Sequence, residues 1–131
     1  MKYMLLIQGP KSARDEFSAM PSEDREAHAD FMRALNDELR ESGELVDVQA
    51  LVGSEEAKVV RARDSGPPAV TDGPFPEAKE FLAGYWIVDV EGPERAVEIA
   101  ARASGAPGRN GAPVKNSIEV RQVMSVPGAE T

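Results

Sequence analysis

The order of helical and strand-like segments is the feature that most constrains how this chain can fold. Six segments show either the alternation or continuous apolar run of a strand, or the apolar spacing of a helix. They are residues 2–8, 23–42, 45–51, 85–90, 93–104 and 117–123, in the order β-α-β-β-α-β. A short charged strand at 58–63 and a return at 69–70 insert a β-hairpin between the third and fourth segments.

This order predicts an α+β protein with a ferredoxin-like βαββαβ sheet and an inserted β-hairpin. The first segment is a nearly continuous apolar run, so we expect it at the centre of the sheet. Both helices carry an apolar stripe and therefore cover one face of the sheet. The other face carries Ile87 and Val123 beside Tyr85, Glu119 and Arg121. A symmetric partner sheet is the simplest cover for that face, which predicts a homodimer through the sheet faces.

Local signals predict how the segments begin and end. Ser22 is expected to cap the first helix, and Gly43 is expected to end it. Residues 9–21 are expected to be a connection containing Gly, Pro and Ser, with Phe17 and Met20 as possible anchors. Residues 104–116, rich in Gly, Pro and Asn, are expected to form a mobile loop that could act as a lid. The apolar stripe of the first helix is expected to comprise Ala27, Phe31, Ala34, Leu35 and Leu39.

The stretch from Val70 to Glu80 joins the hairpin to the most apolar strand. Its Asp-Gly-Pro sequence is strong turn chemistry, because Gly73 tolerates positive φ, the following proline fixes φ, and the Asp72 side chain can cap the turn. Pro76 suits the first position of a short helical turn that leads into the strand.

Composition excludes several classes of protein. A chain of 131 residues suits a single domain, here residues 1–124, followed by a flexible tail at 125–131. The net charge of −8, without a basic stripe, argues against nucleic-acid binding. No apolar run approaches the roughly 20 residues of a membrane span, which favours a cytoplasmic protein without membrane contact. With one histidine and no cysteine, no metal site is expected and no cofactor is implied.

Several short motifs recur in the order of a known family. They are Asp72 to Phe75, Glu77, Lys79-Glu80, Gly84-Tyr85 and Glu119-Val120-Arg121. These motifs resemble the DGPF-domain branch of the YCII-related proteins, and the initial run of residues 2–7 also fits. The family's closing strand usually continues with proline, where this chain has Gln122. The resemblance implies a ferredoxin-like fold of the dimeric α/β-barrel type, which dimerises through its sheets, and a pocket suspected of catalysis.

His28 and Asp72 are the candidate catalytic residues. Imidazole titrates near neutral pH, so His28 could act as a general acid or base, with the Asp72 carboxylate orienting it. The resemblance supports this role, because YCII proteins carry a pocket histidine preceded by Arg-x-x, and Arg25-Glu26-Ala27-His28 is similar. The alternatives are structural: His28 at the border of a solvated helix face, and Asp72 as the cap of its own turn.

Five further residues are candidates for substrate binding. Lys79 and Glu80 could bind an anion and accept a proton, or form a solvated charge pair. Glu119 and Arg121 share one strand face, so they are either pocket walls or residues that make dimerisation specific. Tyr85, next to that face, offers an aromatic wall with a hydroxyl group.

Two hypotheses of function remain open, and the sequence leaves open whether the protein is an enzyme. In the first, a homodimer binds a small organic molecule in a pocket between sheet and helices, and any catalysis is acid–base chemistry without a cofactor, by analogy with dimeric ferredoxin-like enzymes. In the second, the chain is a non-enzymatic regulatory or protein-binding module. Its net charge of −8 would favour basic partners. The family's frequent place beside alternative sigma factors in actinobacteria implies a link to such a system.

Overall fold

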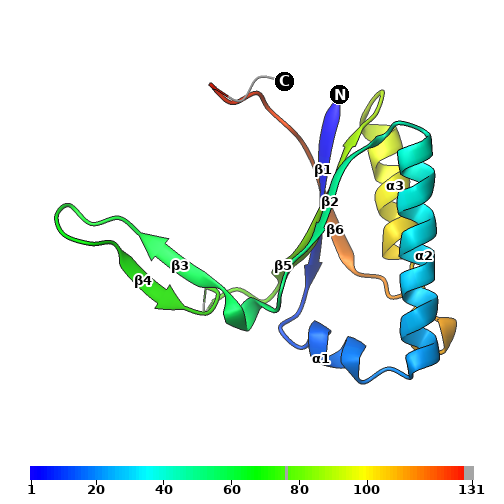
Figure 1. Ribbon diagram of the computed structural model, residues 1–131, viewed down its shortest axis with the longest axis horizontal. Helices are drawn as coiled ribbons and strands as arrows, with labels where there is room; N and C mark the ends of the chain where they lie inside the picture. The colour runs from blue at the N-terminus through cyan, green and yellow to red at the C-terminus, as the bar shows by residue number, and fades with distance from the viewer. Residues whose placement is uncertain (76, 129–131) are drawn as a thin grey trace.

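Two layers and a projecting hairpin make up the computed structural model, which describes residues 1–75 and 77–128. Helices α2 and α3 cover one face of a four-stranded sheet, and the hairpin β3–β4 extends from the opposite side (Figure 1). The elements, with η1 and η2 as short 3₁₀ turns, are β1 (Lys2–Gly9), α1 (Ala13–Ser18), α2 (Ser22–Glu41), β2 (Leu45–Ala50), η1 (Ser54–Glu56), β3 (Lys58–Arg61), β4 (Ala69–Asp72), β5 (Phe81–Asp89), α3 (Pro93–Ser104), η2 (Arg109–Gly111) and β6 (Ser117–Gln122).

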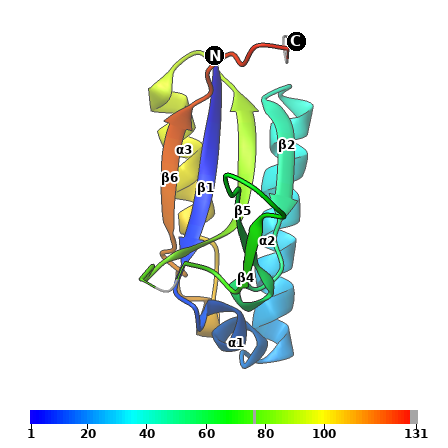
Figure 2. The same ribbon diagram turned by 90° about the vertical axis from the view of Figure 1, so that its left-hand side faces the viewer.

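The strand order in the large sheet is β2-β5-β1-β6, and each neighbouring pair is antiparallel. Figure 2 shows these four strands from the side that the helices do not cover. The structure confirms an α+β protein, and it confirms that the first strand lies inside the sheet, between β5 and β6. This position follows from its continuous apolar run, since a strand paired on both sides exposes neither edge.

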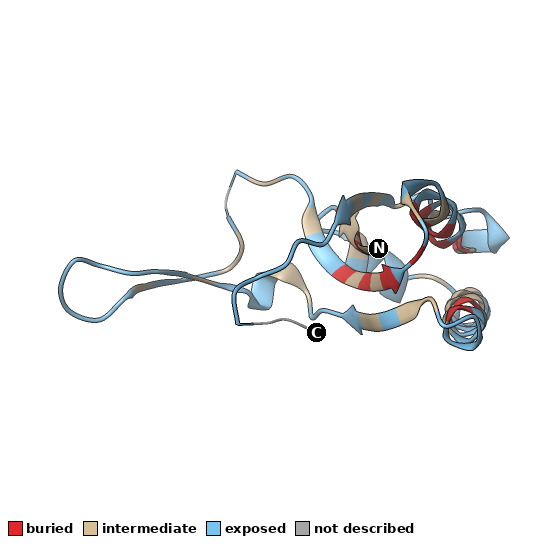
Figure 3. Cartoon of the chain, turned by 90° about the horizontal axis from the view of Figure 1, so that it is seen from above, coloured by how far each residue is buried: buried red, intermediate tan, exposed pale blue. Residues whose placement is uncertain are grey.

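The core lies between the sheet and its two helices (Figure 3). Trp86 and Leu5 contribute from the sheet, and Leu35, Leu39 and Ile99 from the helices, each with at most 2% of its surface exposed. Alternate residues along β5 are buried, which reflects the period of two in a strand with one covered face.

Several local predictions are wrong. Residues 9–21 contain the short helix α1. Ser22 is the first residue of α2 rather than its cap, because Pro21 occupies the cap position, and no side chain caps the helix there. Ala27 and Ala34 are exposed, because the buried stripe is turned toward Met32, Leu35 and Leu39.

Gly43 ends α2 as predicted, with φ of +80°. Its amide donates to the carbonyl of Arg40, and the amide of Glu44 donates to that of Leu39. These two bonds form a Schellman motif, which favours glycine at the residue with positive φ.

The inserted hairpin forms a sheet of its own from β3 and β4, and we call residues 58–72 the arm. Directly after the arm, Gly73 has a φ of +86°, as predicted for the Asp-Gly-Pro turn. The predicted helical turn does not appear among residues 77–80, which form a turn and a bend. Pro76, expected to start that turn, and residues 129–131 of the expected tail lie outside the described residues.

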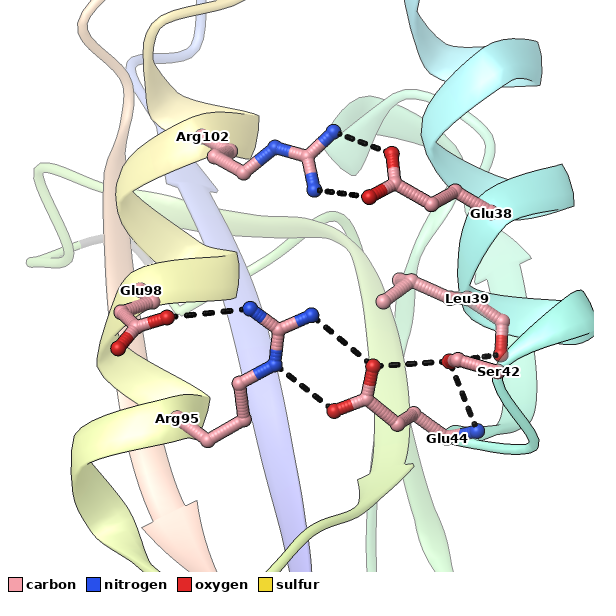
Figure 4. A network of polar contacts seen from close by, with 7 residues as sticks. All are labelled: Glu38, Leu39, Ser42, Glu44, Arg95, Glu98 and Arg102. Carbon is pink, nitrogen blue, oxygen red and sulfur yellow. Dashed lines mark hydrogen bonds and ion pairs between the residues drawn. The ribbon is translucent and has the colours of Figure 1, made fainter.

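Two arginines of α3 form ion pairs with the α2 layer (Figure 4). Arg95 donates to both carboxylate oxygens of Glu44, at 2.8 and 3.0 Å. Arg102 holds Glu38 in the same two-bonded way, at 3.1 and 2.7 Å. Glu44 also accepts a hydrogen bond of 2.8 Å from the Ser42 hydroxyl. These bonds, led by the one from Arg95, lower the pKa of Glu44.

Glu44→Gln is expected to lower the free energy of unfolding at pH 7 by about 1–2 kcal/mol, because the charged Arg95 then faces a neutral amide that has only one acceptor oxygen. The folded-state pKa of Glu44 lies below its ordinary value of 4.5. Its contribution is therefore complete above about pH 4.5 and is lost as the pH falls through the folded-state value. Urea unfolding between pH 3 and 7 should show the gap between wild type and variant closing toward low pH.

Glu98→Gln is the matched control, since Glu98 pairs with the same arginine but its side chain is 65% exposed. We expect a change within about 0.5 kcal/mol for this variant. An equal gap between wild type and Glu44→Gln at pH 3 and pH 7 would contradict the assignment.

Candidate functional site

A cavity of about 560 Å³ opens where α1, the N-terminal half of α2 and the segment after α3 meet. Most of its wall is apolar and includes Phe17, Met20 and Val114. Its polar positions are Glu16, His28, Arg109 and Asn116. A largely apolar cavity of this size with a few polar groups is typical of sites for small organic molecules.

His28 reaches this cavity from α2 in a defined orientation. Its Nδ1 atom lies 3.1 Å from the carbonyl oxygen of Pro107. A carbonyl oxygen only accepts hydrogen bonds, so Nδ1 carries the hydrogen and Nε2 is the basic nitrogen of the neutral ring. The ring of Phe17 packs edge-on against the imidazole, with centroids 5.2 Å apart and planes inclined at 68°. The hydrogen bond thus selects the tautomer of the imidazole, and the aromatic contact restrains the orientation of its ring.

The segment 104–116 forms one wall of the cavity and is held at several points. Arg109 donates to the carbonyl of Ala19 at 3.3 Å, and the amide of Asn110 donates to Asp24 at 3.1 Å. Within the segment, an isolated β-bridge joins Pro107 to Pro113. These bonds connect the segment, which was expected to be a mobile loop, to the corner between α1 and α2. Its role as a lid stays a prediction.

A second cavity of about 480 Å³ lies on the other side of α1. Its wall joins the end of β1 and α1 to the segment after β2 and the start of β5. Phe17 lines both cavities, so α1 separates them. Lys11 and Arg14 give this second cavity a cationic rim, with Glu55 as its acidic member.

The structure does not bring Asp72 to His28. Asp72 ends β4 in the arm, where its side chain is 85% exposed and pairs with Lys58 at 2.7 Å. The arm projects from the sheet side opposite α2 (Figure 1), whereas His28 faces Pro107 and Phe17. The predicted pairing of Asp72 with His28 is thus corrected for the single chain.

The other predicted residues fall into two further places. Lys79 and Glu80 are exposed in the bend before β5. Tyr85, Glu119 and Arg121 lie on the sheet face without helices, which we call the outer face. This face is away from the 560 Å³ cavity beside His28, which we call the His28 cavity.

Tyr85 on that outer face donates a hydrogen bond of 3.2 Å to Asp47. Desolvation, followed by this bond and the Asp47 charge, raises the pKa of Tyr85 above its ordinary value of 10.0. Arg121 and Glu119 approach to 3.8 Å with exposed side chains, which makes them a weak surface pair in the single chain.

Residues 1–124 match the family model described as the YCII-related domain. The chain belongs to the YCII-related family. An uncharacterised protein of Rhizobium meliloti (strain 1021) is 31% identical over 121 residues, which cover 92% of this chain and 90% of that protein. The resemblance drawn from the sequence motifs is thereby confirmed, since DGPF is another name for the same family.

In this YCII-related protein the Gly-Tyr motif has a packing reason. A Cβ atom on Gly84 would lie 2.7 Å from the carbonyl oxygen of Gln49 and 3.3 Å from the Cα of Ala50. Strand β5 can approach β2 this closely only because residue 84 has no side chain. The motif therefore maintains the sheet rather than the cavity.

The sequence-based candidates omitted most of the cavity wall of this YCII-related protein. Phe17 and Met20 were expected only as anchors of a connection, and Arg109 lies in the segment expected to be a mobile loop, so none of them was a site candidate. Among residues 1–75 and 77–128, no three side chains of the usual metal-binding types cluster. In the same described part of the chain, no helix has the length and apolar character needed to cross a bilayer.

Proposed function

We propose that this YCII-related protein is a homodimer of the dimeric α/β-barrel type that binds a small organic molecule beside His28, and that His28 performs acid–base chemistry without a cofactor. The observation that carries the proposal is the cavity of about 560 Å³ beside His28. In this cavity an imidazole held in one orientation meets a mostly apolar wall. A general base needs a fixed nitrogen within reach of the substrate, and the bond to Pro107 orients the ring for that.

The ferredoxin-like assignment is supported by the strand order β2-β5-β1-β6 with all neighbours antiparallel. Both long helices follow the pattern in which a helix connects two strands separated by a third. This topology leaves one sheet face without helices.

The homodimer is supported by the side chains on that outer face. Leu6 lies between Tyr85 and Glu119 in the register, and Met4 lies between Ile87 and Arg121. Each row thus has an apolar centre and a polar end. An apolar centre with a polar rim is the arrangement of protein interfaces. Glu119 and Arg121 would then act in dimer specificity.

The ligand that fits the cavity is a mainly apolar molecule with one hydrogen-bonding group. Phe17 and Met20 provide apolar contact, and Arg109 and Asn116 provide donors. Asp72 has no part in this proposal, because it lies in the arm and pairs with Lys58.

A fragment screen by two-dimensional ¹H–¹⁵N NMR tests the proposal. We expect hits to shift the amides of residues 13–20 and 108–116 and the ring signals of His28, which is the one histidine of the chain. Hits confined to other regions, or no hits in a screen of several hundred fragments, would contradict it. A stable complex with another protein that persists in His28→Asn would favour the regulatory alternative instead.

A further inference from the structure

The arm exposes apolar side chains that its own chain does not cover. Val60 and Val70 face each other across the two strands and are 62% and 53% exposed. A two-stranded sheet buries too little on its own to be stable in water, so it needs another surface to pack against.

Polar contacts do not tie the described residues of the arm to the body of the molecule. Within residues 58–72, side-chain hydrogen bonds join Lys58 to Asp72, Thr71 to the carbonyl of Val59, and Arg63 to the carbonyl of Pro67. At the base, the amide of Gly73 donates to Ala57, just outside the arm. The arm therefore projects from the molecule, and its side-chain hydrogen bonds lie within the arm itself.

The direction and length of the arm indicate what covers it. The arm extends from the sheet side without helices, into the space that a stacked second sheet would occupy (Figures 1 and 2). Stacked sheets lie ~10 Å apart, and strand residues advance ~3.3 Å each, so the residues from Lys58 to the turn at Asp64 span ~20 Å. An arm of this length passes the plane of a second sheet and reaches along its flank.

Charge favours a second copy of this chain as the occupant. The arm carries Lys58, Arg61 and Arg63 against Asp64 and Asp72, so it is slightly basic on a chain of net charge −8. Helix α2 carries seven carboxylates against three arginines, and it lies in the layer behind the sheet. An arm that passes the partner's sheet would bring its cations toward that acidic layer.

We propose that the arm docks on the flank of a second copy, with Val60 and Val70 packed against it and Arg61 and Arg63 toward its acidic helix layer. The inference rests on the homodimer of the proposed function and adds a contact between the arm of each protomer and the flank of its partner. We call this contact the clasp. Each protomer then holds its partner by an element separate from the stacked sheet faces.

The double variant Val60→Asp/Val70→Asp tests the clasp by sedimentation equilibrium over a range of protein concentrations. We expect the dimer dissociation constant to rise about tenfold or more, because two apolar side chains in each arm lose their cover. Val97→Asp is the matched control, since Val97 is a similarly exposed valine, at 55%, on α3. The control should leave the dissociation constant unchanged.

Ile87→Lys separates the clasp from the stacked faces, because Ile87 lies on the outer face of β5. A dimer that is lost with Ile87→Lys but unaffected by the double variant would overturn the clasp and leave the stacked dimer standing. A wild-type chain that stays monomeric would overturn both.

A second measurement does not depend on apolar-to-charged changes. The chain has no cysteine, so Val60→Cys can carry a single photoreactive crosslinker. Mixing this labelled chain with ¹⁵N-labelled wild type should give crosslinked peptides of mixed isotope content. Crosslinks only within one chain would overturn the inference.

Discussion

Replacing Trp86 by alanine is expected to lower the free energy of unfolding by about 3–5 kcal/mol. Trp86 is 2% exposed at the centre of the core, and its indole nitrogen donates a hydrogen bond of 2.7 Å to the Asn36 side chain. The variant loses both the apolar contacts and this bond, and leaves the Asn36 oxygen without its donor. Urea unfolding at a fixed protein concentration, followed by circular dichroism, measures the effect.

Trp86→Phe and Val97→Ala are the matched comparisons for this experiment. Phenylalanine keeps most of the ring volume but lacks the indole N–H donor, so we expect the free energy of unfolding to fall by about 1–3 kcal/mol. The exposed Val97 should change the free energy of unfolding by no more than about 0.5 kcal/mol. A loss below about 1 kcal/mol for Trp86→Ala would contradict a core built around this residue.

His28→Asn is expected to lower the turnover of a substrate found for the His28 cavity by about 10²–10⁴-fold. The asparagine amide can still donate to the Pro107 carbonyl, so the contact between α2 and the segment after α3 is kept. What the variant lacks is the basic Nε2 atom. Steady-state kinetics of wild type and variant measure the effect, with binding followed separately by NMR.

The control for His28→Asn is Asp72→Asn, which changes the exposed carboxylate of the arm. We expect turnover to stay within about twofold of wild type, because Asp72 contacts neither the cavity nor His28 in the single chain. An equal loss of turnover in both variants would restore the predicted pairing of His28 with Asp72. It would place Asp72 of one protomer at the His28 cavity of its partner. Unchanged turnover in His28→Asn would end the acid–base proposal.

The succession of long elements could be predicted because it depends on local periodicity. The apolar run at residues 2–7 identifies an interior strand, and the spacing of Leu35 and Leu39 identifies one buried helix face. The face of α2 was less well predicted, since alanine at positions 27 and 34 is compatible with burial and with exposure.

The cavity could not be predicted because its wall has no periodic pattern. Helix α1 spans six residues, too few to show an apolar stripe, and none of them is buried. The segment 104–116 looked irregular because its order comes from single bonds such as that of Arg109 to Ala19. Such bonds join residues that lie far apart in the chain, and short-range sequence patterns carry no information about them.

The sequence by itself determined the order of the elements, the interior place of β1, and the turns at Gly43 and Gly73, because these follow from apolar spacing and from backbone sterics within a few residues. Only the tertiary structure decided what His28 faces, since Pro107 is 79 residues away along the chain. It also decided that Asp72 points away with the arm. Long-range packing and hydrogen bonds set these positions, and no local pattern encodes them.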